Sequence, residues 1–271
     1  MGDREHVPAQ RRVLGIDLGG ASSDTTGYAV LEGSDLPALL AAGRPTKASS
    51  PAESEEVLLA LVDEWTPAAV AIDAPLTLPP CLTCPSYCRG PGSLCELRAA
   101  QAMWSAGRNP VSQRPCEVAV HERLGEWPLP TMQLGVITAR AVAFARRLAS
   151  RGVPPSVLER GEVLEVYPRA TQRRLEPRHP DLRPRAKGEA KVVYGQRVVA
   201  GFEVLIDGID PHRAEFKSGH VLDALTAAYT GWLGLGRLEA PPPGFNLASG
   251  WIWMPRTTEG APAAVIDPDV V

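Results

Sequence analysis

Two apolar segments that each end in an aspartate constrain the fold of this chain more than any other feature. VLGID ends at Asp17, and AAVAID ends at Asp73. The second segment has no polar alternation, which predicts a strand buried on both faces. A carboxylate at the end of a buried strand is costly unless a cation or hydrogen-bond donors compensate its charge. The pair therefore predicts an α/β protein with an acidic site at one edge of its sheet.

The remaining patterns extend this prediction to one mixed sheet flanked by helices, within a single domain over residues 12–256. Ser50-Pro51-Ala52-Glu53 is a capping box with proline at the first helical position. A right-handed crossover through the helix that follows would make the first and fourth strands neighbours, so that Asp17 and Asp73 meet. The expected strands are 13–18, 26–33, 36–43, 68–73 and 163–168, and the expected helices are 51–65, 131–150 and 216–233.

The segments outside this core have distinctive compositions. Residues 74–128 are rich in Pro, Gly and Cys and are interpreted as an insertion, and residues 169–215 as a basic connection. We expect disordered tails at 1–11 and 257–271. No apolar run is long enough to span a bilayer, and the polar start has no signal-peptide core, so we expect a cytoplasmic protein without membrane contact.

A third acid, Asp223, lies in the helical segment HVLDALTAAY. The neighbouring alanines are small enough to let this helix approach the sheet, which would bring Asp223 to Asp17 and Asp73. Mg²⁺ and Mn²⁺ prefer hard oxygen ligands, so these carboxylates are candidate metal ligands. His220 is one turn earlier on the same helix face and could orient a ligand or water. Alternatively, Asp17 is a turn residue, Asp73 a structural acid and Asp223 part of a solvated helix face. The occurrence of all three acids in this order favours the metal site.

Three further residues are weaker candidates for the same site. Glu165, in VLEVYP, is a potential fourth metal ligand or a partner for Arg169. In RPCE, Arg114 could grip a phosphate bidentately while Glu117 orients it. A plain surface ion pair between these two residues is the alternative.

Four cysteines are close enough in sequence to converge on one centre: Cys81, Cys84, Cys88 and Cys95. Clustered thiols in a cytosolic chain favour metal binding over disulfides. Four thiolates bind either Zn²⁺ or an iron–sulfur cluster such as [4Fe-4S], and the spacing lacks the paired motif of a zinc ribbon. Such a centre would staple a segment that is too poor in apolar residues to form its own core.

Basic residues are locally in excess although the chain has a net charge of −3. The segment from Arg169 to Arg197 contains nine Arg or Lys residues but only three acids. This excess could supply phosphate contacts to a nucleic acid, whereas a solvated loop is the alternative. Aromatic residues do not alternate with these basic residues, so the pattern of the segment does not indicate base stacking.

The order of these motifs resembles the ribonuclease H-like fold, in particular Holliday-junction resolvases of the RuvC type. More closely, the chain is similar to a family of predicted RNase H-like nucleases filed as a domain of unknown function. The motifs that carry this similarity are GID, AIDAPLTLP, RPCE, EVYP, HVLDALTAAY and GWIWMP, spread over residues 13–255. The resemblance implies acids on the first strand, the fourth strand and the last helix, matching Asp17, Asp73 and Asp223.

Three functions are compatible with these motifs. The first is a metal-dependent nuclease that acts on DNA or RNA through two metal ions. The second is an actin-like or sugar-kinase-like phosphotransferase, because GIDLGG resembles the first phosphate loop of those ATPases. A second such loop is not evident after residue 130, which disfavours this alternative. The third is a non-catalytic, metal-bound scaffold that binds nucleic acid or a protein.

Overall fold

A mixed sheet forms the centre of the molecule. The computed structural model describes residues 11–20, 25–45, 50–84, 98–155, 162–243, 245 and 250–257. Within these residues, five strands form one sheet in the order β3-β2-β1-β4-β5. The strands are β1 (Arg12–Asp17), β2 (Gly27–Glu32), β3 (Ala38–Gly43), β4 (Ala69–Asp73) and β5 (Val163–Glu165). The predicted α/β fold with a mixed sheet is confirmed, and it is consistent with a ribonuclease H-like arrangement.

The pairing of β1 with β4 positions the two strand-end aspartates. β1 runs antiparallel to β2 and parallel to β4, and β5 runs parallel to β4. Helix α1 (Pro51–Trp65) provides the crossover that a parallel pair requires, and Ser50 caps it by accepting a hydrogen bond from the Glu53 amide at 3.2 Å. In the register of β1 and β4, Asp17 lies directly opposite Asp73. The predicted adjacency of the two strands is therefore confirmed.

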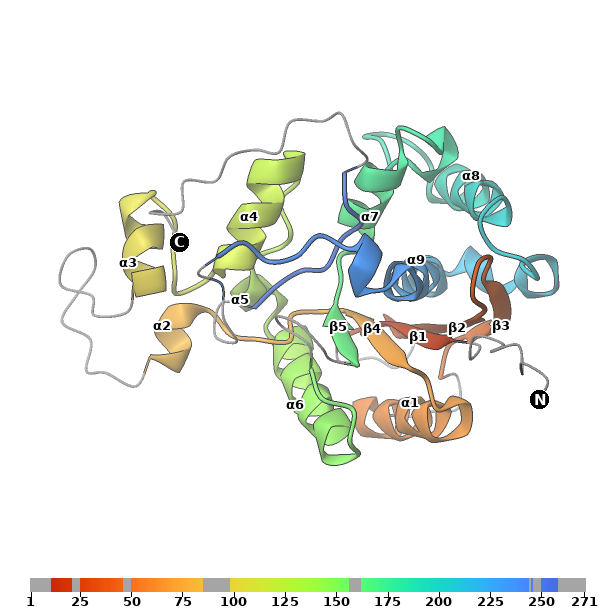
Figure 1. Cartoon of the computed structure of the whole chain (residues 1–271), viewed down its shortest axis with the longest axis horizontal. Coiled ribbons are helices and arrows are strands. Elements are labelled where there is room, and N and C mark those ends of the chain that lie inside the picture. Colours follow the sequence, from red (N-terminus) through yellow and green to blue (C-terminus); the bar gives the residue numbers. More distant parts are fainter. Residues whose placement is uncertain are drawn as a thin grey trace, which may run out of the picture.

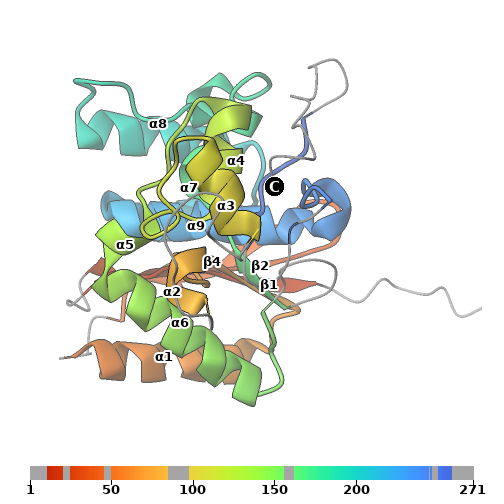
Figure 2. The same cartoon turned by 90° about the vertical axis from the view of Figure 1, so that its left-hand side faces the viewer.

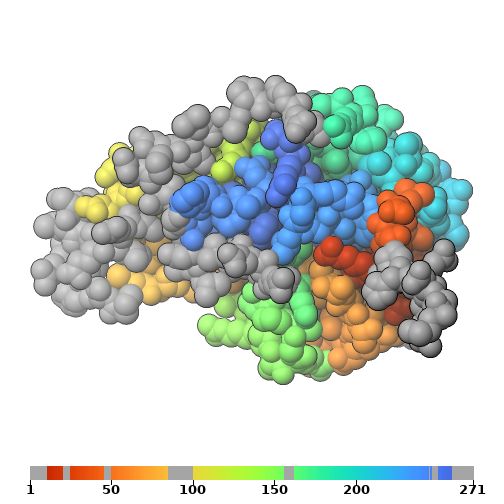
Figure 3. Space-filling view, viewed as in Figure 1, coloured from red at the N-terminus to blue at the C-terminus, as the bar shows by residue number. Residues whose placement is uncertain are grey.

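Helices cover both faces of the sheet (Figures 1 and 2). Helix α1 and helix α6 (Val136–Ser150) cover one face, and helix α9 (Gly219–Leu233) covers the other. Beyond α9 lie α7 (Pro168–Leu175) and α8 (Lys191–Glu203), which form a further layer. Figure 3 shows α9 and the segment after it, in blue, between this layer above and α1 and α6 below.

Shorter helices connect these layers and extend the molecule beyond β5 (Figure 1). The α-helices among them are α2 (Pro80–Thr83), α3 (Arg98–Ser105), α4 (Pro115–Leu124) and α5 (Thr131–Leu134). The 3-10 turns are η3 (Pro180–Leu182), η4 (Asp210–His212), η5 (Glu215–Lys217) and η6 (Leu235–Arg237).

Small residues let α9 approach the sheet until backbones touch. A Cβ atom added to Gly15 would lie 2.2 Å from the Ala224 carbonyl oxygen, so no larger residue fits there. Gly27 is equally confined, because its Cβ would lie 2.3 Å from the His220 carbonyl oxygen. Ala224 and Ala228 are fully buried on this face, as expected from the sequence. The close approach places the first turn of α9 over the ends of β1 and β4.

The structure differs from the sequence-based expectations in the connections. The predicted helix over 131–150 is divided at Gly135, whose φ of 41° breaks the helical hydrogen-bond ladder. The basic connection, residues 169–215, contains most of α7 and all of α8 rather than a loop. In the insertion, residues 74–128, the described part forms α2, α3 and α4, whereas 85–97 lie outside the described residues.

Two other expectations concern the termini and membranes. Of the predicted disordered tails, residues 1–10 and 258–271 lie outside the described residues. Arg11 is described, and its carbonyl oxygen accepts a hydrogen bond from the Gly33 amide at 3.2 Å. Across the described residues, no helix has the length and apolar character needed to cross a bilayer.

Candidate acidic site

Asp17 and Asp73 point toward α9 because of the alternation of side chains along a strand. Gly15, two residues before Asp17, packs against α9, and side chains two apart share a face. Asp73 shares this face because residues opposite each other in a parallel pair point the same way. Neighbouring strands are about 4.8 Å apart, so the two carboxylates are adjacent. The sheet register thus creates a pair of like charges.

Asp223, the fifth residue of α9, is the third acid near this pair. Burial and the nearby charge of Asp17 raise the pKa of Asp223 to about 7. Burial, followed by the charges of Asp17, Asp223 and Glu165, raises the pKa of Asp73 well above its usual value. No described residue donates a hydrogen bond to the carboxylate of Asp73 or Asp223. Asp73 and Asp223 are therefore half-buried carboxylates without a hydrogen-bond donor among the described residues, and a shared cation site with Asp17 stays a prediction.

His220 partly compensates Asp17. A hydrogen bond of 2.7 Å joins Nδ1 of His220 to Oδ2 of Asp17, in which the ring N–H donates to the carboxylate. This bond raises the pKa of His220, while burial still raises the pKa of Asp17. The Asp17 side chain is 13% exposed and the His220 side chain 42% exposed, so solvent reaches the pair. The hydrogen bond therefore fixes the position of the Asp17 carboxylate, and a role of His220 toward a metal ligand or water stays a prediction.

The donor set of this cluster matches a hard divalent cation. The three carboxylates come from distant segments, and among the described residues their only ion pair is that of Asp17 with His220. They offer the oxygen ligands that Mg²⁺ and Mn²⁺ prefer. In their present positions, no three His, Cys, Asp or Glu side chains of the described residues form a metal-holding group. A cation would have to draw these carboxylates closer together, and its positive charge would offset their mutual repulsion.

Glu165 belongs to a different, fully compensated group on the other side of the sheet. It lies opposite Ile72 in the register, one residue before Asp73, so its side chain points away from α9. Arg114 donates to it bidentately, with Nη1 2.8 Å from Oε2 and Nη2 2.5 Å from Oε1. The ion partner of Glu165 is therefore Arg114, not Arg169, which pairs with Glu126 instead.

Arg114 and Glu117 form a buried ion pair rather than a surface one. Both side chains are 1% exposed, and Arg114 Nε lies 3.1 Å from Glu117 Oε1. Arg114 Nη1 also donates to Thr77 Oγ1 at 3.0 Å, so all three guanidinium nitrogens have protein acceptors. Glu117 additionally accepts a hydrogen bond from the Thr131 amide at 3.1 Å. Neither residue presents an open phosphate-binding surface in this arrangement.

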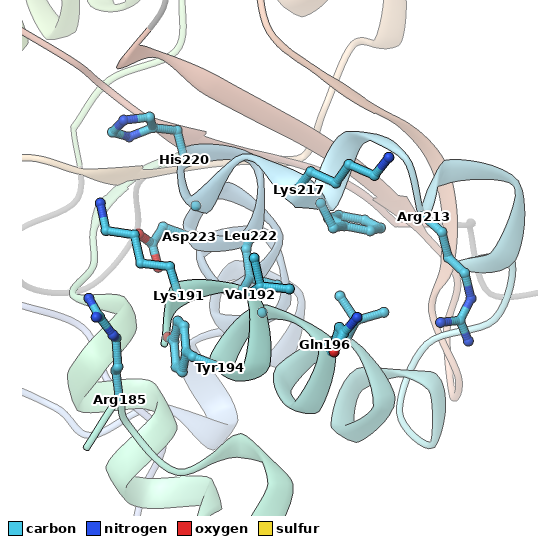
Figure 4. A pocket seen from close by; sticks show the side chains of 14 residues that line it. Arg185, Lys191, Val192, Tyr194, Gln196, Arg213, Lys217, His220, Leu222 and Asp223 are labelled. Carbon is cyan, nitrogen blue, oxygen red and sulfur yellow. The ribbon is translucent and has the colours of Figure 1, made fainter. Parts of the chain in front are cut away.

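Two cavities border the acidic cluster on opposite sides. A cavity of about 230 Å³ is lined by Asp17 and Asp73 and also by Arg114, Glu117 and Glu165. A larger cleft of about 700 Å³ lies between α8 and the start of α9, and we call it the α8–α9 cleft (Figure 4). It is bordered by Asp223 and His220, by basic residues, and by apolar residues including Val192 and Leu222. Asp223 thus connects the acidic cluster to a basic cleft.

Five of the nine basic residues between Arg169 and Arg197 form ion pairs with described residues. Arg169 and Arg173 both pair with Glu126. Arg183 and Arg197 pair with Glu189. Because Glu126 is distant in sequence, a count of charges along the segment could not reveal this pairing. Of the predicted basic residues, only Arg185 and Lys191 border the α8–α9 cleft.

The predicted cysteine centre is only partly within the described residues. Cys81 lies in α2, and Cys84 directly follows that helix. Cys88 and Cys95 lie outside the described residues, so the convergence of the four thiols stays a prediction. The fifth cysteine, Cys116, is fully buried among apolar side chains, and burial raises the pKa of its thiol, which makes it an unreactive core residue.

Sequence reasoning missed two kinds of residue around the site. Arg140, on the otherwise apolar face of α6, donates to the Gly19 carbonyl at 2.8 Å and so fixes the turn after β1. A lone arginine on an apolar helix face was the available signal. Arg213 and Lys217 line the α8–α9 cleft, and only their proximity to Asp223 in sequence pointed to them.

The fold and the site together define a class of protein. It is an α/β protein with acids at the ends of two adjacent parallel strands and on the helix that crosses them. The chain belongs to the DUF429 family, described as protein of unknown function (DUF429), whose family model matches residues 15–245. No curated protein and no solved structure matches the chain.

Proposed function

We propose that this protein is a metal-dependent nuclease that hydrolyses phosphodiester bonds of DNA or RNA. The observation that carries the proposal is the meeting of Asp17, Asp73 and Asp223 without donors to the latter two. Uncompensated carboxylates are unfavourable for folding, so they indicate a functional requirement. The adjoining basic cleft supports a substrate that carries negative charge.

In this proposal the acids hold Mg²⁺ or Mn²⁺, and other residues prepare the site. When bound, such ions would supply activation of a water molecule and stabilisation of the leaving oxygen. His220 holds Asp17 in position through Nδ1, and Arg140 fixes the backbone after Asp17. In the hydrolysis, a water oxygen bonds to phosphorus while the bond from phosphorus to a sugar oxygen breaks. The released sugar oxygen takes up a proton.

The test is cleavage of single-stranded, duplex and branched DNA and of RNA by the full chain with Mg²⁺ or Mn²⁺. A metal ion contributes several kcal/mol to the transition state. We therefore expect Asp17→Asn, Asp73→Asn and Asp223→Asn each to reduce cleavage at least about 100-fold. The matched control is Asp35→Asn, which alters an exposed aspartate away from both cavities and should leave cleavage unchanged.

Two outcomes would contradict the proposal. Cleavage that persists at the parental rate in all three site variants would indicate a contaminating nuclease. Absence of cleavage on every substrate, in protein that binds the cations, would favour the scaffold alternative. An arm of the assay with ATP tests the phosphotransferase alternative, for which nucleotide binding is required.

We further propose that Cys81, Cys84, Cys88 and Cys95 hold an iron–sulfur cluster or Zn²⁺. The support is their spacing, together with the position of the first two at and just after a short helix beyond β5. The centre would have a structural role in the segment that follows Asp73. Iron and zinc analysis of anaerobically purified protein, with its visible absorbance, is the measurement; neither metal at stoichiometric level would contradict this part of the proposal.

A further inference from the structure

The α8–α9 cleft has cationic ends and an apolar middle. In Figure 4, Lys191 and Arg185 lie at the end that also holds Asp223 and His220. Lys217 and Arg213 lie at the other end. Val192 and Leu222 lie between the two ends. A ligand that fills this cleft would therefore have two separated negative groups and an apolar part between them.

The two lysines supply charge that the protein itself does not neutralise. Among the described residues, neither Lys191 nor Lys217 has an acidic ion-pair partner, and both side chains are exposed. Arg213, in contrast, pairs with Glu203 and with Asp210. Arg185 donates to the Glu189 carbonyl oxygen at 2.8 Å and has no acidic ion-pair partner within the described part of the chain. The positive charge at each end is therefore available to an anion.

The middle of the cleft suits a flat apolar group. Val192 is 70% exposed, and it faces the cleft beside the buried Val199. Toward the end with Lys191 and Arg185, the ring of Tyr194 (Figure 4) is held in place because its hydroxyl accepts a hydrogen bond from Gln172 Nε2 at 2.7 Å. A fixed aromatic ring and aliphatic side chains can contact the face of any nucleobase without sequence preference.

We infer that the α8–α9 cleft receives one unpaired nucleotide of a single-stranded nucleic acid, with its two flanking phosphates at the cationic ends. This inference rests on the proposed function, because the phosphate at the Asp223 end would be the one next to the acidic cluster. A base in a duplex is paired and stacked, so its face cannot contact Val192 and Tyr194. The substrate class is therefore a single strand or an unpaired segment within a larger structure.

The test measures binding separately from cleavage. A fluorescently labelled oligothymidylate and its duplex with oligoadenylate are titrated with the full chain in excess EDTA, and fluorescence anisotropy is recorded. We expect the single strand to bind at least about tenfold tighter than the duplex, because stacking adds to the phosphate contacts. Replacing the central nucleotides by abasic ones should remove most of this preference.

Charge reversal identifies the cleft as the place of binding. Lys191→Glu combined with Lys217→Glu should weaken single-strand binding at least about tenfold and lower the log–log salt slope by about 1.4. The matched control is Arg146→Glu combined with Arg151→Glu, which makes the same change in net charge on and just after α6, across the sheet. The control should alter affinity less than about twofold, since screening is strong at that distance.

The outcomes separate the inference from the proposed function. Duplex binding as tight as single-strand binding, or an equal loss in the control variant, would overturn the inference. Aspartate-dependent cleavage of duplexes without any preference for single strands would also overturn it, while the nuclease proposal would stand. Single-strand preference lost on charge reversal, in a protein that cleaves no substrate, would support the cleft and overturn the nuclease proposal.

Discussion

Two groups of carboxylates meet at the same end of the sheet, and they differ in how their charge is compensated. Glu117 and Glu165, on one side, share the guanidinium of Arg114. Asp73 and Asp223, on the other side, receive no hydrogen bond from a described residue. Glu117, Glu165 and Asp73 line the cavity of about 230 Å³, and Asp223 lines the α8–α9 cleft. The two groups therefore differ in two ways: Glu117 and Glu165 are buried and paired with a cation, whereas Asp73 and Asp223 are half-buried and have no such partner.

The comparison also explains why the two groups should respond differently to mutation. A buried ion pair is tolerated because each charge satisfies the other, and removal of one partner leaves an uncompensated charge. A cluster of like charges is unfavourable from the start, so removal of one member relieves repulsion. Function is then maintained at the expense of stability, as in many active sites.

The largest expected effect is on the compensated group. Arg114→Leu leaves Glu117 and Glu165 buried without a cation, and we expect the free energy of unfolding to fall by about 3–5 kcal/mol. Urea denaturation followed by circular dichroism measures this change. Arg169→Leu, which breaks the more exposed pair with Glu126, is the control and should cost less than about 1 kcal/mol. Equal losses in the two variants would remove the distinction between the groups.

A smaller effect of opposite sign is expected in the uncompensated group. Asp73→Asn removes one like charge from the cluster without changing the size of the side chain. We expect the free energy of unfolding to rise by about 2 kcal/mol at about pH 8 in the absence of divalent cations. The same denaturation assay reads the change. A loss of stability would mean that Asp73 is a structural acid.

The smallest expected effect is a pH dependence of stability. The pKa of Asp223 is about 7 in the folded protein, compared with 3.8 for an aspartate outside the fold. Protonation of Asp223 therefore favours folding. This contribution is fully present below the lower value and is lost as pH rises through the higher one. His220, whose pKa is also raised, acts in the same direction at higher pH.

We expect the lost stability to be about 1 kcal/mol, because solvent reaches these side chains and screens them. Unfolding free energies of the parent and of Asp223→Asn, measured between about pH 4 and pH 8 without divalent cations, test the direction. The variant should show the shallower decline, whereas Asp35→Asn should follow the parent. If the free energy of unfolding of the parent increased between about pH 4 and pH 8, the predicted direction of the pH dependence would be wrong.

The core of the fold was predictable because its signals are local. VLGID and AAVAID identified β1 and β4, and the capping box at Ser50 identified the start of α1. Parallel pairing then follows from the chirality of the crossover. The small residues of α9 indicated a close approach, and Gly15 and Gly27 show its extent. The adjacency of the strand ends that carry Asp17 and Asp73 could therefore be predicted without a structure, whereas their sharing of one site with Asp223 stays a prediction.

The partners of charged residues were not predictable, because they depend on contacts between distant segments. Arg114 is 51 positions from Glu165 in sequence, and Arg173 is 47 positions from Glu126. Strand register also matters, since Glu165 aligns with Ile72 and so faces away from Asp73. A shift by one residue would have placed it beside the acidic cluster. These details decide which charges are satisfied and which remain available.

Binding of Mn²⁺ to the full chain, followed by electron paramagnetic resonance at about pH 8, tests the central claim most directly, because Mn²⁺ prefers carboxylate oxygens over the cysteine thiolates. The account predicts saturable binding that is lost in Asp73→Asn and retained in Asp35→Asn. Absence of saturable binding, or equal binding in Asp73→Asn and the parent, would contradict the assignment of Asp17, Asp73 and Asp223 to one cation site.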